Sequence, residues 1–325
     1  MEKDIVIIGG GPAGMAAALA AKENGAEDIL IIERSDRLGG ILNQCIHNGF
    51  GIEKFKKELT GPEYADIYEK RIKAEKIKYL TNAMVTGVLA DKTVTVCSEE
   101  GVKEIKAKAI VFATGCRERT RGSLNIPGFR GAGVINAGTA QKFINEMGYV
   151  PGKKVVILGS GDIGLIMARR CTLEGAQVLA VAEIMPQSRG LKRNIVQCLN
   201  DFDIPLYLSH TVTKIYGKSR VTGVDIAKVD ENLNPISETT FHLDCDTLML
   251  SVGLIPENEL ARMAGIKMDE KTGGPVVDEN LETSLPGVYS CGNCLHVFDI
   301  VDNVSDNAEI AGKSAAEFVK KECGK

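Results

Sequence analysis

The sequence predicts an α/β protein in which one strand-turn-helix module occurs twice, with the second copy inserted into the first. Two observations predict this fold. A glycine turn between an apolar run and a helical run near the N-terminus is repeated near the middle of the chain. Each copy is also followed by short β-rich segments, and each series closes on an apolar strand that ends in glycine. We therefore expect two related domains.

The first module begins at the N-terminus. Residues 4–8 are apolar and β-branched, residues 9–14 are Gly-Gly-Gly-Pro-Ala-Gly, and the alanine-rich residues 15–23 favour a helix. A second apolar strand over residues 29–32 ends at Glu33, nineteen residues beyond the last glycine of the turn. A strand, a Gly-x-Gly-x-x-Gly turn, a helix and an acidic residue at this spacing are typical of a Rossmann-like dinucleotide-binding domain.

Each glycine of this turn has a physical role. Gly9 permits the tight turn, Gly11 lets the backbone approach a pyrophosphate, and Gly14 lets the helix pack closely on the strand. The helix N-terminus attracts the phosphates, and Glu33 would accept hydrogen bonds from an adenosine ribose. The alternative for the glycines is a simple left-handed turn without a ligand, and the alternative for Glu33 is a solvated strand end. The candidate cofactor-binding residues of the first module are Gly9, Gly11, Pro12, Ala13, Gly14, Glu33 and Arg34.

The second module repeats this order. Residues 154–158 favour a strand, residues 159–164 are Gly-Ser-Gly-Asp-Ile-Gly, residues 165–174 favour a helix, and residues 178–182 favour a strand that ends at Glu183. The candidate nucleotide-binding residues here are Gly159, Gly161, Asp162, Ile163, Gly164 and Glu183. Two dinucleotide sites in one chain predict one permanent and one exchangeable cofactor, for which FAD and a nicotinamide nucleotide are the natural pair.

The closing strands define the expected domain boundaries. The β-rich segments before them span residues 84–89, 93–97 and 104–106 in the first copy, and residues 212–216, 221–229 and 239–243 in the second. The closing strands cover residues 109–115 and 247–253. The remaining tail is too short for a third domain and should complete the first module, with a helix over roughly residues 306–321. We predict an FAD-binding domain over residues 1–117 and 254–325, and an NAD(H)-binding domain over residues 118–253.

These motifs resemble those of the pyridine nucleotide-disulfide oxidoreductase superfamily of flavoproteins over nearly the whole chain. The matching positions are Gly9, Gly11, Gly14, Glu33, Gly39, Gly40, Ala113, Thr114, Gly115, Gly159, Gly161, Gly164, Gly253, and the segment 283–293, which includes Gly292 and Asn293. The resemblance implies that the first module binds FAD, that the second binds NAD(P)H, and that segment 283–293 contacts the ribityl and pyrophosphate groups. Asn293 stands where the superfamily has aspartate, but its amide still accepts and donates hydrogen bonds, so FAD binding is still expected.

The redox dithiols of the superfamily are missing from this sequence. Members similar to glutathione reductase have two cysteines just after the Gly-Gly pair, where this chain has only Cys45. Thioredoxin reductases have a C-x-x-C motif before the second nucleotide strand, where residues 135–150 contain no cysteine. Segments 39–51 and 113–119 instead look like those of flavoprotein subunits found with glycerol-3-phosphate, amino-acid or opine dehydrogenases. That resemblance implies that a second protein subunit is the electron donor or acceptor.

Two cysteine-containing segments supply further candidates. Cys45 and His47 lie on a stretch that runs beneath the isoalloxazine ring in the superfamily, so they are the candidate catalytic residues, with packing alone as the alternative. Cys291, Cys294 and His296 have C-x-x-C-x-H spacing, which would suit a metal site or a transient disulfide. One such motif lacks the other ligands of a closed site, so a packed thiol is the favoured interpretation and no metal is predicted.

Composition excludes several classes of function. The chain has 39 Lys and Arg against 43 Asp and Glu, a formal net charge of −4, so neither nucleic acid nor an anionic membrane is an expected partner. The uncharged residues 5–21 follow no basic flank and contain the glycine turn, so neither a transmembrane segment nor a signal peptide is predicted. Nine scattered cysteines without an export signal favour reduced thiols in the cytoplasm.

We therefore expect an FAD-dependent oxidoreductase that passes hydride between NAD(H) and FAD and exchanges electrons with a partner subunit or a small acceptor. The alternatives are a flavoprotein subunit of a glycerol-3-phosphate or amino-acid/opine dehydrogenase complex, and a flavoprotein that only senses nucleotide. NADH should be preferred over NADPH, because the Glu183 carboxylate would repel a 2′-phosphate. Arg189, Lys192 and Arg193 would weaken this preference if their loop folds back. An oligomer is compatible with the sequence.

Overall fold

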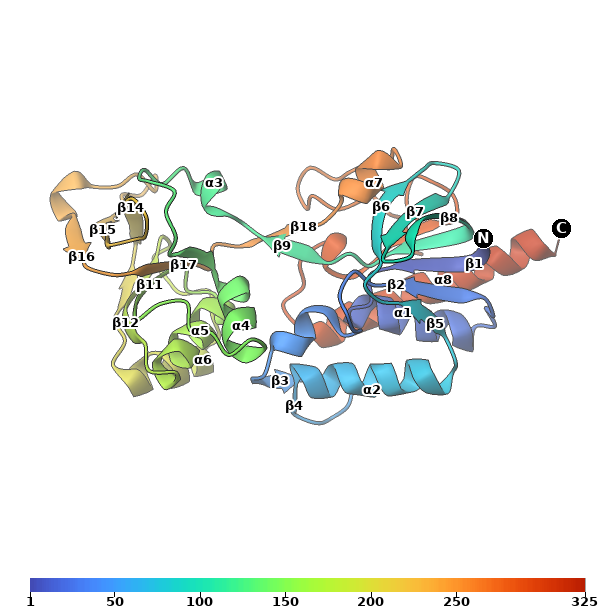
Figure 1. Cartoon of the computed structure of the whole chain (residues 1–325), viewed down its shortest axis with the longest axis horizontal. Coiled ribbons are helices and arrows are strands. Elements are labelled where there is room, and N and C mark those ends of the chain that lie inside the picture. The colour runs from blue at the N-terminus through green and yellow to red at the C-terminus, as the bar shows by residue number, and fades with distance from the viewer. Residues whose placement is uncertain (325) are drawn as a thin grey trace. The chain divides into compact units, whose positions relative to one another are not determined.

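The computed structural model describes residues 1–324, apart from the side chain of Cys323, and divides into two compact units. Unit 1 comprises Met1–Arg117 and Ile255–Lys325, and unit 2 comprises Glu118–Leu254. The two connections between the units, β9 (Cys116–Glu118) and β18 (Leu254–Pro256), pair with each other (Figure 1). The predicted fold class is confirmed: the chain contains two Rossmann-like α/β units, the second inserted into the first.

Unit 1 is built on a seven-stranded sheet in the order β5-β2-β1-β8-β7-β6, with β19 also paired to β8. Strands β5, β2, β1, β8 and β19 run parallel, whereas β6, β7 and β8 form an antiparallel meander. The bounds are β1 (Glu2–Ile8), β2 (Ile29–Ile32), β5 (Lys78–Leu80), β6 (Met84–Val88), β7 (Thr93–Ser98), β8 (Gly101–Phe112) and β19 (Val288–Ser290). Both faces of β1 are buried, with Ile5 and Ile7 in one apolar cluster and Val6 and Ile8 in another. This two-sided burial explains why the strand is continuously apolar.

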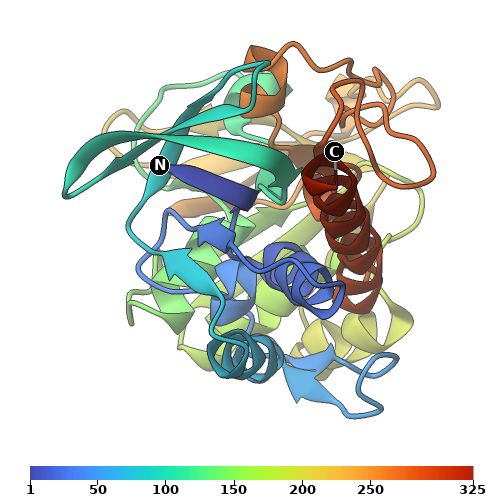
Figure 2. The same cartoon turned by 90° about the vertical axis from the view of Figure 1, so that its right-hand side faces the viewer.

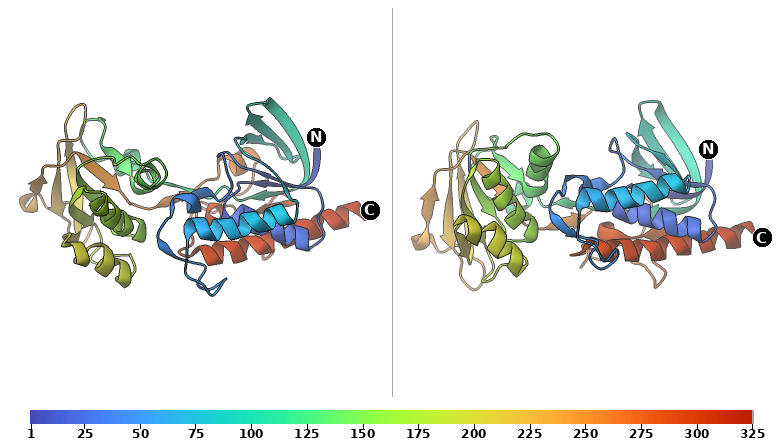
Figure 3. Two further views of the ribbon diagram at one scale, coloured as in Figure 1. Left: turned by 60° about the horizontal axis from the view of Figure 1, so that its bottom comes forward. Right: turned by 90° about the horizontal axis from the view of Figure 1, so that it is seen from below.

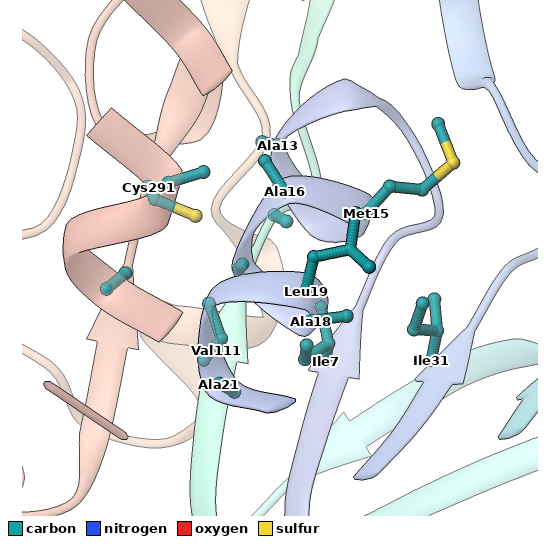
Figure 4. Packing of buried hydrophobic residues seen from close by; sticks show 14 of the residues in the cluster. Ile7, Ala13, Met15, Ala16, Ala18, Leu19, Ala21, Ile31, Val111 and Cys291 are labelled. Carbon is teal, nitrogen blue, oxygen red and sulfur yellow. The ribbon is translucent and has the colours of Figure 1, made fainter. Parts of the chain in front are cut away.

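Helices cover one face of this sheet. Figure 3 shows α1 (Pro12–Glu23), α2 (Gly61–Ala74) and α8 (Val301–Cys323) together on that face. The alanine-rich α1 packs closely against α8, since a Cβ at Gly312 would stand only 2.0 Å from the Ala17 carbonyl oxygen. Figure 4 shows the small and aliphatic side chains that fill this layer. The other elements of unit 1 are η1 (Gly40–Gln44), β3 (Asn48–Phe50), β4 (Leu59–Thr60), α7 (Glu259–Met263) and η4 (Gly292–Cys294).

Three expected boundaries in unit 1 were wrong. The separate strands expected over residues 104–106 and 109–115 are one strand, because β8 pairs with β7 along its first half and with β19 along its last residues. The last helix starts at Val301 rather than near residue 306, although Val301 and the preceding isoleucine are β-branched. The strand expected over residues 109–115 ends at Phe112, before the Ala113-Thr114-Gly115 segment.

Unit 2 contains a five-stranded parallel sheet in the order β10-β17-β11-β12-β13 and an antiparallel sheet in the order β14-β15-β16. The strands are β10 (Val134–Asn136), β11 (Lys154–Leu158), β12 (Gln177–Glu183), β13 (Leu206–Leu208), β14 (His210–Tyr216), β15 (Gly223–Lys228), β16 (Phe241–Leu243) and β17 (Thr247–Leu250). The helices are α3 (Arg121–Leu124), α4 (Ala137–Asn145), α5 (Asp162–Leu173), α6 (Lys192–Cys198), η2 (Asn200–Phe202) and η3 (Ser237–Thr239). No helix within residues 1–324 is long and apolar enough to cross a membrane.

Candidate functional site

Two glycines of the first turn are required by the fold itself. Gly9 has φ +109°, and a Cβ there would stand 2.4 Å from the Ala113 carbonyl oxygen. A Cβ at Gly14 would stand 1.8 Å from the Gly9 carbonyl oxygen, so only glycine lets α1 begin this close to β1. These contacts join β1, α1 and the end of β8 at one point.

Gly11 differs from its neighbours because its side-chain position opens into free space. Its φ is −75°, and the nearest heavy atom to a Cβ there is the Gly40 Cα at 3.9 Å. Gly11 is the N-cap of α1, and among the described residues no side chain caps this helix. Backbone N–H groups of the first helical turn, including those of Ala13 and Gly14, are therefore available to a ligand beside Pro12. This open cradle at a helix N-terminus fits a pyrophosphate.

Glu33 is fixed beside this cradle. It is buried at the end of β2, where Oε2 accepts a hydrogen bond from the Gly10 backbone N–H at 2.7 Å. Oε1 accepts from the Ser35 backbone N–H at 2.8 Å. The neighbouring Arg34 is exposed. The glutamate thus ties the glycine turn to the end of the second strand and keeps its carboxylate in one place.

The second module has the same geometry. Gly159 has φ +102° with a Cβ position 2.0 Å from the Ser251 carbonyl oxygen, and a Cβ at Gly164 would stand 2.5 Å from the Gly159 carbonyl oxygen. A Cβ at Gly161, the N-cap of α5, would have no heavy atom within 4 Å. The buried Glu183 accepts from the Ser160 backbone N–H at 2.9 Å and the Ser160 hydroxyl at 2.7 Å, both through Oε2.

The loop after Glu183 folds back onto this turn, which is the condition under which Arg189, Lys192 and Arg193 were expected to weaken the preference for NADH. The Ser160 carbonyl oxygen accepts from the Ser188 hydroxyl at 2.9 Å and the Gly190 backbone N–H at 3.1 Å. Asp162 Oδ1 then accepts from the Leu191 N–H at 2.8 Å and the Asn194 side-chain amide at 2.7 Å. The half-buried Ile163 follows Asp162 in α5. The exposed Arg189 therefore stands between two anchored residues, next to the turn that holds Glu183.

The other candidate cofactor-binding residues lie on separate segments of the chain. Gly39 and Gly40 have φ of +108° and +55°, at the start of η1. Ala113 is buried, the Thr114 hydroxyl donates to the Glu257 carbonyl oxygen at 2.7 Å, and Gly115 has φ +72° with open space at its Cβ position. In unit 2, Gly253 has φ +108° with similar open space.

Asn293 has a fixed amide orientation. Its Oδ1 accepts from the Phe298 backbone N–H at 3.1 Å, and its Nδ2 donates toward the Cys116 sulfur at 3.7 Å. The preceding Gly292 donates its N–H to Asn307 Oδ1 on α8 at 2.9 Å. Cys116 was not among the residues expected at this site, although it directly follows Gly115 in the sequence.

Cys45 and His47 lie between η1 and β3. The half-buried Cys45 thiol donates to the Ile41 carbonyl oxygen at 3.3 Å. His47 Nδ1 lies 3.1 Å from the Asn48 carbonyl oxygen, and its ring is 5.0 Å from that of Phe50. Both side chains thus make contacts within their own segment of the chain.

Cys291 and Cys294 are packed thiols. Both are fully buried and contact the same Phe112 carbonyl oxygen, at 3.6 and 3.3 Å. Cys291 belongs to the helix-covered cluster (Figure 4), whereas Cys294 belongs to the cluster on the other face of the sheet. Burial raises the pKa of the Cys291 thiol well above its usual value, which disfavours the reactive thiolate. His296 is exposed and lies 3.9 Å from the Phe298 ring. Within residues 1–324, no group of three or more His, Cys, Asp or Glu side chains is placed to hold a metal ion.

Residues 3–315 match the family model described as pyridine nucleotide-disulphide oxidoreductase. The chain is 25% identical to an opine oxidase subunit of Agrobacterium tumefaciens, covering 97% of this chain and 63% of that protein. It is 28% identical to an alkyl hydroperoxide reductase subunit of Staphylococcus aureus, covering 89% of this chain and 54% of that protein. The chain thus spans less than two thirds of the length of these curated relatives. The thioredoxin reductase of Lactococcus lactis has the same fold, with a TM-score of 0.79, 21% identity, and coverage of 98% of this chain and 99% of that chain.

Proposed function

The chain belongs to the pyridine nucleotide-disulphide oxidoreductase family, and from this membership we propose that it is an FAD-dependent oxidoreductase that passes hydride between NAD(H) and FAD. Unit 1 would bind FAD and unit 2 would bind NAD(H), with NADH preferred over NADPH. When bound, the two cofactors supply the redox chemistry, which is hydride transfer between the nicotinamide and flavin rings. Reduced thiols at the eight described cysteines support a cytoplasmic location.

The main support for this proposal is that each unit has an equivalent glycine turn at the N-terminus of a helix. Gly11 and Gly161 both stand at the N-terminus of a helix and leave open space where a Cβ would lie. Glu33 and Glu183 occupy equivalent places, each at the end of the neighbouring strand with its carboxylate bound to the backbone of the turn. The same chain therefore has two sites suited to an adenosine diphosphate group, one in each unit.

The side chains at the proposed flavin site would bind and orient the flavin rather than take part in the reaction. Thr114 and Asn293 are held by hydrogen bonds to backbone groups, which would align the ring system. Alignment is the main requirement of hydride transfer between two cofactors. Cys45 and His47 remain candidate contacts of the ring.

We further propose that electrons are exchanged with a second protein subunit or a small acceptor. The sequence lacks the redox dithiol motifs of the superfamily, and the eight cysteines whose side chains the structure describes form no disulfide with one another. Both curated relatives bear names that mark them as parts of larger enzymes. The second candidate function is a flavoprotein subunit of an opine, amino-acid or glycerol-3-phosphate dehydrogenase complex. It is favoured by the opine oxidase relative, whose match covers 97% of this chain.

Anaerobic mixing of the FAD-loaded protein with NADH tests the proposed function. We expect the flavin absorbance to bleach within seconds, at a rate that saturates with NADH, because both cofactors are bound in one chain. A flavoprotein that only senses nucleotide would bind NADH without bleaching, which would overturn the proposal.

The need for a partner is tested by following reoxidation of the reduced flavin, with proteins co-purified from the native host as acceptors. Fast, saturable turnover of a specific metabolite by the purified chain alone would contradict the need for a partner.

A Cys45→Ser variant tests whether a thiol relay takes part. We expect its turnover of NADH with ferricyanide to stay within about tenfold of the wild type, a change of ~1.4 kcal/mol in activation free energy. The physical reason is that a relay needs a second thiol, whereas Cys45 is the only cysteine just after the Gly-Gly pair in the sequence. Cys294→Ser serves as the matched control at a buried thiol. A loss of several powers of ten for Cys45→Ser alone would make Cys45 part of the electron path.

A further inference from the structure

A short hairpin follows the segment that carries Cys45 and His47. Strands β3 (Asn48–Phe50) and β4 (Leu59–Thr60) pair and enclose a turn over residues 51–58 (Figure 2). Because β3 begins one residue after His47, the position of the hairpin determines the positions of the Cys45 and His47 side chains. The hairpin is joined to the rest of unit 1 by contacts with residues far away in the sequence.

The main contact is made by Asp302, in the first turn of α8. This residue is 1% exposed. Oδ1 accepts from the Gly51 backbone N–H at 3.1 Å, and Oδ2 accepts from the backbone N–H groups of Glu53 at 2.8 Å and Lys54 at 3.1 Å. Three backbone donors on one buried carboxylate make strong, charge-assisted hydrogen bonds. The start of the turn is therefore fixed to α8.

Two further contacts hold the same turn. The Lys54 ammonium pairs with Asp306 and Glu309, one and two turns further along α8. The Phe55 ring meets the Tyr64 ring of α2 edge-on, with centroids 5.1 Å apart. The turn is thus clamped between α8 on one side and α2 on the other.

The same end of α8 also holds the second segment of the proposed flavin site. Asn307, five residues beyond Asp302, accepts the Gly292 N–H beside Asn293. Asp302 and Asn307 therefore set the distance between the segment that carries Cys45 and the segment that carries Asn293. Neither Asp302 nor Asn307 belongs to any of the cofactor motifs in the sequence.

We propose that Asp302 is a positioning residue of the FAD site, which holds the hairpin so that Cys45 and His47 stay beside the flavin ring. The inference rests on the proposed function, because it takes unit 1 to be the FAD-binding unit. A buried carboxylate is costly unless its hydrogen bonds are complete, and the three backbone donors of the turn complete them.

The test is Asp302→Asn in the full chain, with Asp299→Asn as the matched control, since Asp299 is an exposed aspartate three residues earlier. The amide keeps the shape but replaces one acceptor oxygen by a donor that faces a backbone N–H. We expect trypsin to cleave after Lys56 and Lys57 at least about tenfold faster in the apoprotein, and the dissociation constant of FAD to rise about tenfold. The FAD-saturated variant should also show a shifted flavin reduction potential and a changed visible circular dichroism spectrum, which a loss of stability alone would not produce.

The outcomes separate this inference from the proposed function. A wild type that binds no FAD would overturn both. A wild type that binds FAD, together with an Asp302→Asn variant that matches the Asp299→Asn control in cleavage, potential and spectrum, would overturn the inference alone. If Asp302→Asn does not fold, Lys54→Gln loosens the turn from its exposed side and must change the flavin spectrum in the same direction. An unchanged spectrum in that variant would overturn the inference.

Discussion

A Gly11→Val variant is expected to fold and to lose FAD. Gly11 has an ordinary φ of −75°, and a Cβ there meets its nearest heavy atom, the Gly40 Cα, at 3.9 Å. The apoprotein should therefore lose no more than about 1 kcal/mol of stability, the typical cost of a poor N-cap residue. The added methyl groups would enter the space proposed for the pyrophosphate, so the dissociation constant of FAD should rise at least about 100-fold, or ~2.7 kcal/mol. Thermal unfolding of the apoprotein and titration with FAD measure the two effects.

Two other glycines provide controls for this experiment. Gly161→Val occupies open space in unit 2, so it should leave FAD bound while it abolishes bleaching of the flavin by NADH. Gly9→Ala should fail to fold, because its Cβ would meet the Ala113 carbonyl oxygen at 2.4 Å and its φ of +109° suits only glycine. A Gly11→Val protein with wild-type FAD affinity would show that the pyrophosphate does not bind at this turn.

The parts of the fold that could be predicted from the sequence are those specified by neighbouring residues. The strand before Gly9, the glycine turn and the helix after it follow from local periodicity and from backbone geometry that only glycine adopts. The repeat near Gly159 has the same local signals, which is why both modules and the α/β class were predicted. The spacing predicted that Glu33 and Glu183 contact an adenosine ribose. The structure shows each of them bound to the backbone of its turn, and the ribose contact stays a prediction.

What could not be predicted depends on contacts between residues distant in sequence. The start of α8 was placed too late, because Val301 favours a strand locally while Asp302 is bound to a turn about 250 residues earlier. The two expected strands around residue 107 are one, because different strands pair with the two halves of β8. The return of the loop at Ser188 onto Ser160 likewise had no local signal.

That returning loop bears on the choice between NADH and NADPH. Ser160 binds Glu183 through its N–H and hydroxyl, and its carbonyl oxygen accepts from Ser188 and Gly190, the two neighbours of Arg189. The Glu183 carboxylate and the loop that carries Arg189 are therefore both anchored to the turn proposed for the adenosine ribose. The carboxylate is buried and held by three hydrogen bonds, whereas Arg189 is exposed on its loop. The glutamate should dominate, so the wild type should prefer NADH.

We expect Glu183→Gln to lower the ratio of kcat/KM for NADH to that for NADPH by about tenfold or more, since like-charge repulsion of a 2′-phosphate is worth roughly 1 to 3 kcal/mol. Glutamine keeps one acceptor oxygen for Ser160 and removes the charge that opposes the phosphate, although its amide nitrogen then faces the Met185 N–H. Adding Arg189→Ala to this variant should weaken the binding of NADPH again, because one of the three cations of this loop is then lost. Glu33→Gln, which makes the same change at the equivalent carboxylate of unit 1, should affect FAD retention and leave the NADH to NADPH ratio unchanged. Equal ratios in the wild type and in Glu183→Gln would show that Glu183 does not contact the nucleotide ribose, and the assignment of NAD(H) to this turn would have to be abandoned.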